Sequence, residues 1–131
     1  MLIDTSGWYC VLVEEDRQHV EASGIYSSAQ TRVTHSLIVA ELIALCERRR
    51  FSRSRTLEFI STLLIDAGVR IVWVDEDTVQ TAFALLLDRP DKLWSLCDAV
   101  SFILMDELGI TEALTTDRHF EQAGFVKLLE S

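Results

Sequence analysis

Short apolar segments rich in β-forming residues alternate with longer helical segments along the whole chain, and this alternation restricts the possible folds more than any other feature. Each short segment is bounded by polar or turn-forming residues, as a buried strand is where it leaves a sheet. The five segments are residues 1–6 (MLIDTS), 32–35 (RVTH), 69–74 (VRIVWV), 112–115 (EALT) and 125–128 (FVKL). Strands separated by helices pair in parallel, and one Pro with five Gly is too few for an all-β fold with many tight turns.

Helical periodicity and helix-end signals fill the intervals between these strands. We expect helices over residues 7–29, with a weak break at residues 23–24, and over 36–50, 55–67, 75–88, 95–108 and 117–123. Ser36 and Ser95 are predicted N-caps, and Gly68 and Gly109 are predicted stops. The order β-α-β-α-α-β-α-α-β-α-β predicts an α/β fold with a central parallel sheet covered by helices on both faces, within a single domain over residues 1–131.

No segment is expected to enter a membrane or a secretory pathway. No stretch approaches the roughly 18 uninterrupted apolar residues of a membrane span, and the N-terminus lacks the basic region of a signal peptide. Cys10, Cys46 and Cys97 stand among apolar neighbours without CxxC spacing, so we expect buried, reduced thiols and no zinc site. These features predict a cytoplasmic protein.

Four of the 21 acidic residues stand where water should be scarce, and burying a carboxylate is costly unless a cation or hydrogen bonds compensate. Asp4 and Asp117 each follow a predicted strand, and ligands of open α/β sheets bind beyond the carboxyl ends of the strands. For both residues, capping of the following helix is an equally good explanation.

The other two acids, Glu41 and Asp98, lie on predicted helices. Glu41 falls on the apolar stripe of its helix, where the alternative explanation is an internal ion pair with an arginine. Its neighbours at helical spacing are Leu37, Ile38, Ala44 and Leu45. Asp98 matches an acidic capping box with Ser95, and this structural explanation is compatible with a further role at a helix N-terminus.

A set of oxygen ligands suits Mg²⁺ or Mn²⁺ rather than Zn²⁺. The net charge of −9 opposes binding of a phosphate backbone, but bound divalent ions would offset several of these charges. The basic residues are also clustered, and five of them are candidates for contact with a phosphate backbone. These are Arg48, Arg49, Arg50, Arg53 and Arg55.

Taken in order, the four acids and their neighbours resemble the PIN-domain nucleases. The matching pieces are Ile-Asp4-Thr-Ser, Ala-Glu41-Leu, Trp94-Ser-Leu-Cys-Asp98-Ala and Leu114-Thr-Thr-Asp117-Arg-His-Phe, which together span nearly the whole chain. A stand-alone domain of this length is similar to the VapC-type toxins of bacterial toxin–antitoxin pairs. The resemblance implies a PIN-like α/β/α sandwich, a cytoplasmic Mg²⁺- or Mn²⁺-dependent ribonuclease that leaves a 5′-phosphate and a 3′-hydroxyl, a homodimer, and inhibition by a small antitoxin.

We expect distinct roles for the four acids. Asp4 and Asp98 are the predicted direct metal ligands, and Asp117 ligates directly or through water. Glu41 either holds a second ion or orients the attacking water. All four family acids are present, which favours an active enzyme over the alternative of a catalytically silent PIN-like scaffold that binds RNA or protein.

Polar neighbours have two explanations each. Thr5, Ser6 and Thr116 either donate hydrogen bonds to the carboxylates or substrate, or cap turns. The arginine cluster either contacts RNA or forms a solvated helix end, and His119 is expected to pack or to hydrogen-bond at a helix start rather than to bind metal.

Two other α/β enzyme or signalling classes fit less well. Haloacid-dehalogenase-like phosphatases need a second Asp two positions after the first, and Ser6 stands there. A receiver-type signalling module has a phospho-acceptor after a middle strand, a role open to Asp75, but its N-terminal acidic pair is missing and Lys127 lies inside the last predicted strand.

Overall fold

The strands form one parallel sheet at the centre of the molecule. The computed structural model describes all 131 residues. Its strands are β1 (Leu2–Ile3), β2 (Val33–His35), β3 (Arg70–Val72), β4 (Glu112–Leu114) and β5 (Val126–Lys127). They lie in the order β3-β2-β1-β4-β5, and every neighbouring pair is parallel. The predicted parallel sheet and its five strands are confirmed.

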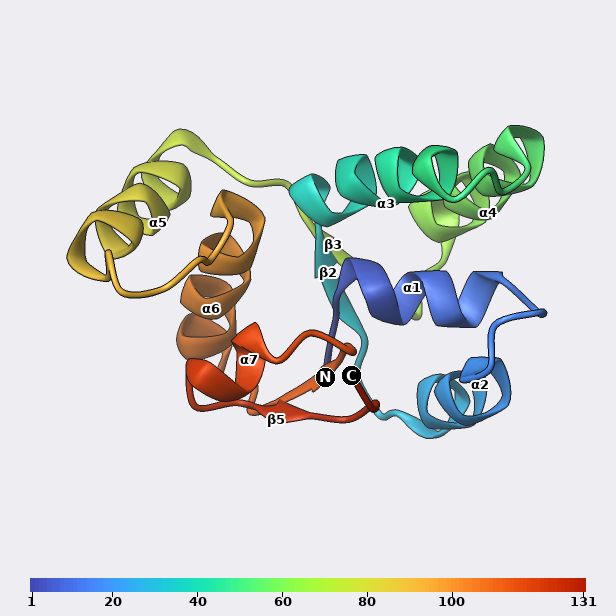
Figure 1. Ribbon diagram of the computed structural model, residues 1–131. Coiled ribbons are helices and arrows are strands. Elements are labelled where there is room, and N and C mark those ends of the chain that lie inside the picture. Colours follow the sequence, from blue (N-terminus) through green and yellow to red (C-terminus); the bar gives the residue numbers. More distant parts are fainter.

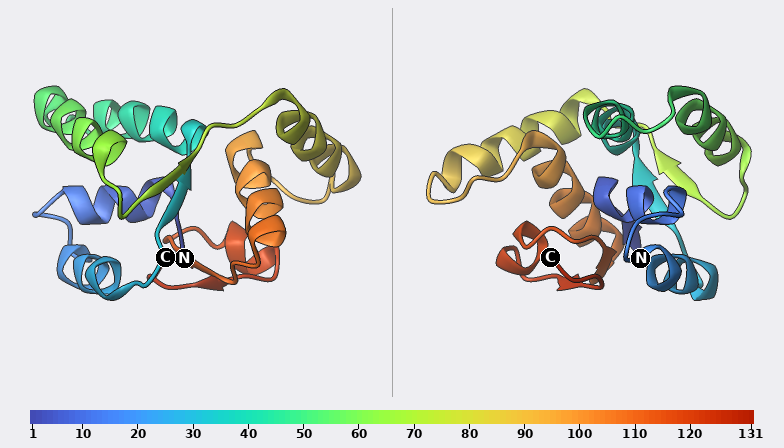
Figure 2. Two further views of the ribbon diagram at one scale, coloured as in Figure 1. Left: turned by 180° about the vertical axis from the view of Figure 1, so that it is seen from behind. Right: turned by 45° about the vertical axis from the view of Figure 1, so that its right-hand side comes forward.

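Helices cover the sheet on both sides (Figure 1). One layer contains α1 (Thr5–Leu12), α2 (His19–Ser28), α3 (Ser36–Arg48) and α4 (Arg53–Ile65). The other contains α5 (Glu76–Asp88), α6 (Leu96–Leu108) and α7 (His119–Gln122), and the view from behind shows the same separation (Figure 2). The predicted three-layer α/β/α sandwich is therefore confirmed. None of these helices has the length and apolar character that crossing a membrane requires.

One tryptophan joins the strands to the first helical layer. Trp8 on α1 is fully buried, and its indole Nε1 donates to Thr34 Oγ1 at 3.0 Å. That hydroxyl in turn donates to the carbonyl of Ile3 at 3.1 Å, so the polar atoms in this part of the core are paired. The indole ring packs edge-on against Tyr26 of α2 and Phe59 of α4. The three cysteines are also buried and free, as predicted.

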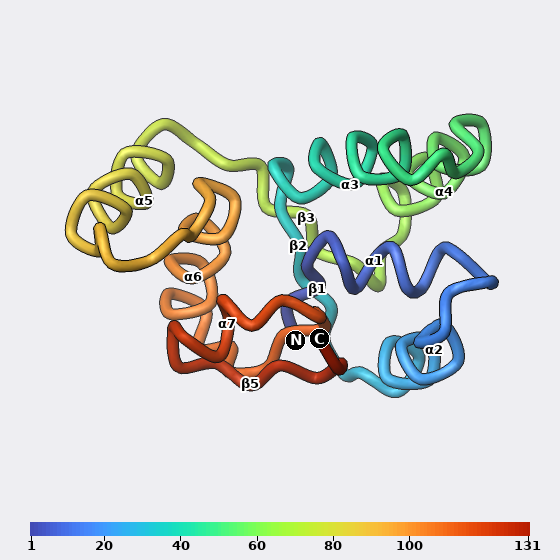
Figure 3. The backbone as a smooth tube through the Cα atoms, in the orientation of Figure 1, coloured from blue at the N-terminus to red at the C-terminus, as the bar shows by residue number.

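The helix predicted over residues 7–29 is two helices, and its break lies elsewhere than expected. α1 ends at Leu12, and the chain turns back before α2 begins (Figure 3). Asp16 shapes this turn because its carboxylate accepts the backbone N–H of Gln18 at 2.9 Å. Gly24 lies inside α2, where a glycine weakens a helix without ending it.

Helix capping matches the prediction at α6 and differs at α3. Ser95 and Asp98 form the predicted capping box, and Gly109 ends α6 with a left-handed φ of 68°. His35, not Ser36, caps α3, because its ring Nδ1 accepts the Ile38 N–H at 3.4 Å. The hydroxyl of Ser36 accepts instead from the N–H of Val74, which follows β3, at 3.0 Å. Helix α4 ends at Ile65, slightly before the predicted stop at Gly68.

Close packing of α1 on β4 generates a stability prediction at Gly7. A Cβ at this position would lie 2.1 Å from the carbonyl oxygen of Leu114, the same oxygen that accepts the Asp4 N–H. We expect Gly7→Ala to lower the free energy of unfolding by at least about 2 kcal/mol, because backbone atoms must shift. Gly24→Ala is the matched control: nothing lies within 4 Å of its Cβ position, and we expect it to stabilise α2 by about 0.5–1 kcal/mol. Urea denaturation measures both, and equal effects of the two variants would contradict the prediction.

Candidate metal centre

The ends of β1 and β4 bring the first candidate acid into the site. Ile3 pairs with Leu114 in the sheet, so the residues that follow these two strands lie side by side. Asp4 follows β1 and is only 5% exposed. It occupies the N-cap position of α1, yet its side chain makes no capping hydrogen bond. Its carboxylate oxygen Oδ2 accepts instead from the hydroxyl of Thr115 at 2.9 Å, so the helix-capping explanation of Asp4 is wrong.

Thr115, the residue after β4, organises this end of the sheet. Besides donating to Asp4, its fully buried hydroxyl accepts the backbone N–H of Asp117 at 3.0 Å and lies 3.1 Å from the Ser6 hydroxyl. Ser6 in turn accepts the backbone N–H of Thr116 at 2.9 Å. Ser6 makes no hydrogen bond to a carboxylate; its side chain bonds Thr115 and the turn that follows β4. Thr116 contributes only its backbone here, and Thr115 was missed because its importance depends on the pairing of β1 with β4.

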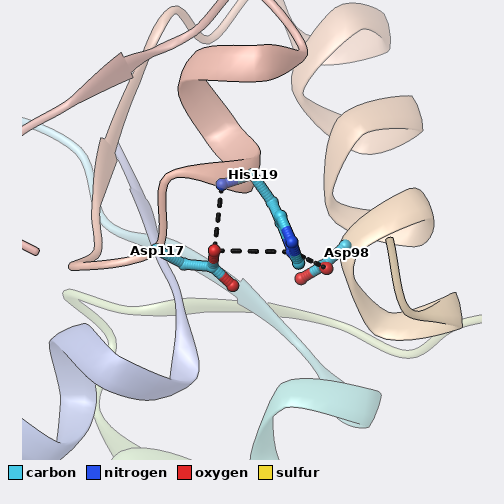
Figure 4. A group of neighbouring side chains, drawn as sticks. All are labelled: Asp98, Asp117 and His119. Atoms are coloured by element: carbon cyan, nitrogen blue, oxygen red, sulfur yellow. Dashed lines mark hydrogen bonds and ion pairs between the residues drawn. The ribbon is translucent and has the colours of Figure 1, made fainter. Parts of the chain in front are cut away.

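Asp98 and Asp117 both accept hydrogen bonds from His119, which lies between them (Figure 4). Asp98 lies in the first turn of α6, and its Oδ2 accepts from the backbone N–H of Ser95 at 3.0 Å and from the His119 ring at 2.9 Å. Asp117 Oδ1 accepts the backbone N–H of His119 at 2.9 Å. Ligand atoms of Asp98, Asp117 and His119 all lie within 4.8 Å of one another. Sequence reasoning undervalued His119, although its place directly after Asp117-Arg118 was a usable signal.

Glu41 reaches the same region from α3. It is half-buried and forms no ion pair with any arginine, so the ion-pair explanation is wrong. It lines a hollow of about 230 Å³ together with Asp4 and Asp117. Glu41, Leu45 and Arg48 all face this hollow because they are spaced along one side of α3. Asp98 completes the group, since its charge acts on Asp4 together with that of Glu41.

Burial and mutual repulsion control the charge of the site. The pKa of Asp4 is raised to about 7, chiefly by burial and also by the carboxylates of Asp98 and Glu41, against the hydrogen bonds that favour ionisation. The buried thiol of Cys97 also has a raised pKa, because of burial first and then the charges of Glu41, Asp4 and Asp98. Such a cluster is costly without a positive charge among its oxygens.

The donor set fits a divalent cation. Asp98 and Asp117 each give one oxygen to hydrogen bonds with the protein and leave the other without a protein partner, and the Asp4 carboxylate accepts from Thr115 and from the Thr5 backbone. Thr5 Oγ1, in the lining of the same hollow, is buried and has no hydrogen-bond partner at all. An unpaired buried hydroxyl is rare in a protein interior, so this atom indicates a partner supplied from outside the chain. Oxygen atoms without a thiolate among them suit Mg²⁺ or Mn²⁺.

The arginine cluster divides into two groups. Arg48 and Arg49 line the hollow beside the acids, and the Arg49 guanidinium lies 4.5 Å from the centre of the Tyr9 ring. Arg50, Arg53 and Arg55 lie outside this hollow. Arg53 pairs with Glu47, Arg55 stacks on Phe51, and Arg50 is exposed in a left-handed conformation.

Comparison with known proteins identifies the family to which this fold belongs. The family model for the PIN domain matches residues 1–126, and the chain belongs to this family. It is 28% identical over 129 residues to the 23S rRNA-specific endonuclease VapC20 from two strains of Mycobacterium tuberculosis, an alignment that covers 98% of this chain and 97% of the relative. The chain in the crystal structure of Mycobacterium tuberculosis VapC20, a Sarcin-Ricin loop cleaving toxin, is 27% identical with a TM-score of 0.87, and the alignment covers 96% of each chain.

A buried histidine links the two helices that carry Glu41 and Asp98. His35 is fully buried at the start of α3, and its Nε2 donates to Ser101 Oγ of α6 at 2.8 Å. The Ser101 hydroxyl donates onward to the carbonyl of Cys97 at 3.1 Å. Burial lowers the pKa of His35 to about 4, so the ring is neutral in the folded protein at pH 7.

This histidine makes a contribution to stability that depends on pH. Since its folded pKa lies below the ordinary 6.5, the unfolded chain binds the proton more tightly, and the contribution is lost as pH falls from about 6.5 to about 4. We expect the cost of His35→Asn, measured by urea denaturation without metal, to grow by up to about 3 kcal/mol from pH 4 to pH 6.5 and to stay constant above. Asp4 contributes to stability with the opposite pH dependence, because its folded pKa is raised. Asp4 is present in both proteins, so subtracting the free energy of unfolding of the variant from that of the wild type removes its contribution. A cost that does not change with pH would contradict a neutral buried ring.

Proposed function

We propose that this protein is a Mg²⁺- or Mn²⁺-dependent endoribonuclease that hydrolyses phosphodiester bonds. The observation that carries the proposal is the convergence of Asp4, Glu41, Asp98 and Asp117 beyond the carboxyl ends of β1 and β4. The hydrogen bonds that Asp4, Asp98 and Asp117 make within the protein do not explain why four carboxylates share one small, partly buried region, where their charges repel. Membership of the PIN family and the named activity of the VapC20 relative support the choice of RNA.

The carboxylate oxygens that lack protein partners indicate which acids would bind the metal. Asp4, Asp98 and Asp117 would hold the metal, while Glu41, which lines the same hollow as Asp4 and Asp117, would hold a second ion or orient the attacking water. A bound divalent ion lowers the pKa of its water and stabilises the charge on the attacked phosphate. The Thr115 hydroxyl keeps Asp4 oriented, and the unpaired Thr5 hydroxyl is available to a water or to a phosphate oxygen.

Two arginines would offset the repulsion between an acidic protein and RNA. Arg48 and Arg49 form one wall of the hollow that contains Asp4, Glu41 and Asp117. A second hollow of about 190 Å³ continues from Arg49 along α1 to Tyr9 and Arg17. An RNA strand with its scissile phosphate at the acids would therefore pass these guanidinium groups on one side of the cut.

We also infer a toxin role with a protein partner. The relative VapC20 is a 23S rRNA-specific endonuclease and a toxin that cleaves the Sarcin-Ricin loop, so 23S rRNA is the first substrate to test here. A cell that makes such a nuclease needs an inhibitor, for which a small antitoxin is the expected form, and a homodimer is the expected assembly. Several large apolar side chains are exposed, in keeping with protein partners. They include Val20, Leu64, Ile65, Phe83 and Leu87. Copurification from native expression, with light scattering for the assembly, is the direct test.

Replacing a ligand oxygen should abolish cleavage without unfolding the protein. In Asp4→Asn the amide oxygen still accepts from Thr115 but carries no charge, so we expect the cleavage rate to fall at least about 100-fold. Stability without metal should hold or rise, because the buried charge is gone. Asp106→Asn, at the exposed far end of α6, is the matched control and should cleave normally. EDTA should abolish wild-type cleavage, and added Mg²⁺ or Mn²⁺ should restore it.

Two outcomes of this assay would count against the proposal. Cleavage that survives both EDTA and Asp4→Asn would contradict a metal-dependent reaction at these acids. Tight RNA binding by the wild type with no cleavage under any metal would favour the catalytically silent scaffold.

Removing one arginine of the hollow should weaken RNA binding more than catalysis. Arg48 makes no ion pair within the protein, so we expect Arg48→Ala to raise KM about tenfold, with kcat little changed. The slope of the logarithm of RNA affinity against the logarithm of salt concentration should also become less steep, by about one counterion. Arg70→Ala, which removes an exposed arginine outside this hollow, serves as the control. Equal effects of the two variants would show that the arginines act only through the overall charge.

A further inference from the structure

We propose that His119 is a positioning residue that fixes the orientation of Asp98 and Asp117 for metal binding, an inference that rests on the proposed function. The histidine is the first residue of α7, and its side chain points to the site between the two aspartates (Figure 4). It uses two different N–H groups. The ring Nδ1 lies 2.9 Å from Asp98 Oδ2 and 3.4 Å from Asp117 Oδ1, while the backbone N–H donates to Asp117 Oδ1 at 2.9 Å.

The bond to Asp98 determines which oxygen of that carboxylate is free. Oδ2 accepts from the Ser95 backbone N–H at 3.0 Å and from the His119 ring, so both donors hold the same oxygen. With Oδ2 held from two directions, the carboxylate cannot rotate about its Cβ–Cγ bond without losing both bonds. The other oxygen, Oδ1, is then presented in a fixed direction, which is the form of preorganisation that metal ligands require.

His119 is itself held by the packing of α7 on α6. The next residue, Phe120, is fully buried and packs edge-on against Phe102 of α6, with ring centres 5.1 Å apart. Trp94, just before α6, donates from its indole Nε1 to the side chain of Gln122 at 3.1 Å. The histidine therefore joins two aspartates from different parts of the chain through a rigid contact between helices.

The hydrogen-bond chemistry makes Nδ1 an orienting donor rather than a ligand. A carboxylate oxygen can only accept, so Nδ1 carries the hydrogen in its short contact with Asp98. A nitrogen that coordinates a metal must have lost that hydrogen. Nδ1 thus acts on the metal through the carboxylates, and its capacity to donate to them is the property that matters.

Two substitutions separate hydrogen bonding from packing. His119→Asn places an amide N–H near the position of Nδ1, whereas His119→Leu keeps apolar volume and has no donor. Mn²⁺ binding is measured by titration calorimetry, with urea denaturation without metal as the measure of folding. We expect His119→Leu to weaken Mn²⁺ binding about 10–100-fold and His119→Asn to stay within about threefold of the wild type. His19→Leu, which alters a ring bonded to the Cys10 carbonyl away from the acids, is the control and should bind Mn²⁺ normally.

The outcomes distinguish this inference from the function on which it rests. The positioning role is overturned, while the metal centre stands, if the wild type and His119→Leu bind Mn²⁺ equally well. The same conclusion follows if His119→Asn and His119→Leu lose the same affinity for Mn²⁺. A nitrogen hyperfine coupling from the His119 ring in the Mn²⁺ electron spin resonance spectrum would also overturn it, because the ring would then be a ligand. No Mn²⁺ binding by the wild type would overturn the metal centre and the positioning role together.

Discussion

The parallel pairing of β1 with β4 is the contact on which the site depends. Because Ile3 lies opposite Leu114, the carboxylate of Asp4 meets the hydroxyl of Thr115, and through Thr115 the turn that carries Asp117 is fixed as well. Gly7 lets α1 approach β4 closely enough for this arrangement, since its missing side chain leaves room for the Leu114 carbonyl. The strands are short, but their ends define where the first and last acids lie, and the helices then bring the other two acids to that point.

The helices carry the remaining charges of the site. One side of α3 presents Glu41 to the acids and, two turns later, Arg48 to the same hollow. The start of α6 supplies Asp98, whose carboxylate is shared between its capping box and His119. His35 ties these two helices together beneath the site. A protein of net charge −9 can thus keep positive groups where a phosphate backbone would come closest.

The sequence predicted the sheet, the layers and the elements on or beside which the four acids stand, because these follow from local patterns. Apolar β-rich runs marked all five strands, and Ser95, Asp98 and Gly109 marked the ends of α6 by side-chain chemistry that acts within a few residues. Other features depend on contacts between distant segments. The bond from His35 to Ser101, the role of Thr115 and the division of the arginine cluster each needed the packed structure, because the partner atoms lie on other elements. The break between α1 and α2 was missed because a turn at Asp16 outweighed the expected weakness at Gly24.

Cys97 lies one residue before Asp98 and is 8% exposed. Its pKa is raised by burial and by three carboxylates of the site, so at neutral pH the sulfur keeps its proton. Oxidants and alkylating agents attack the thiolate rather than the thiol. Burial, and in the metal-free protein the charges of these three acids, therefore keep a sulfur beside the proposed metal centre protonated, and this thiol should react slowly with oxidants and alkylating agents.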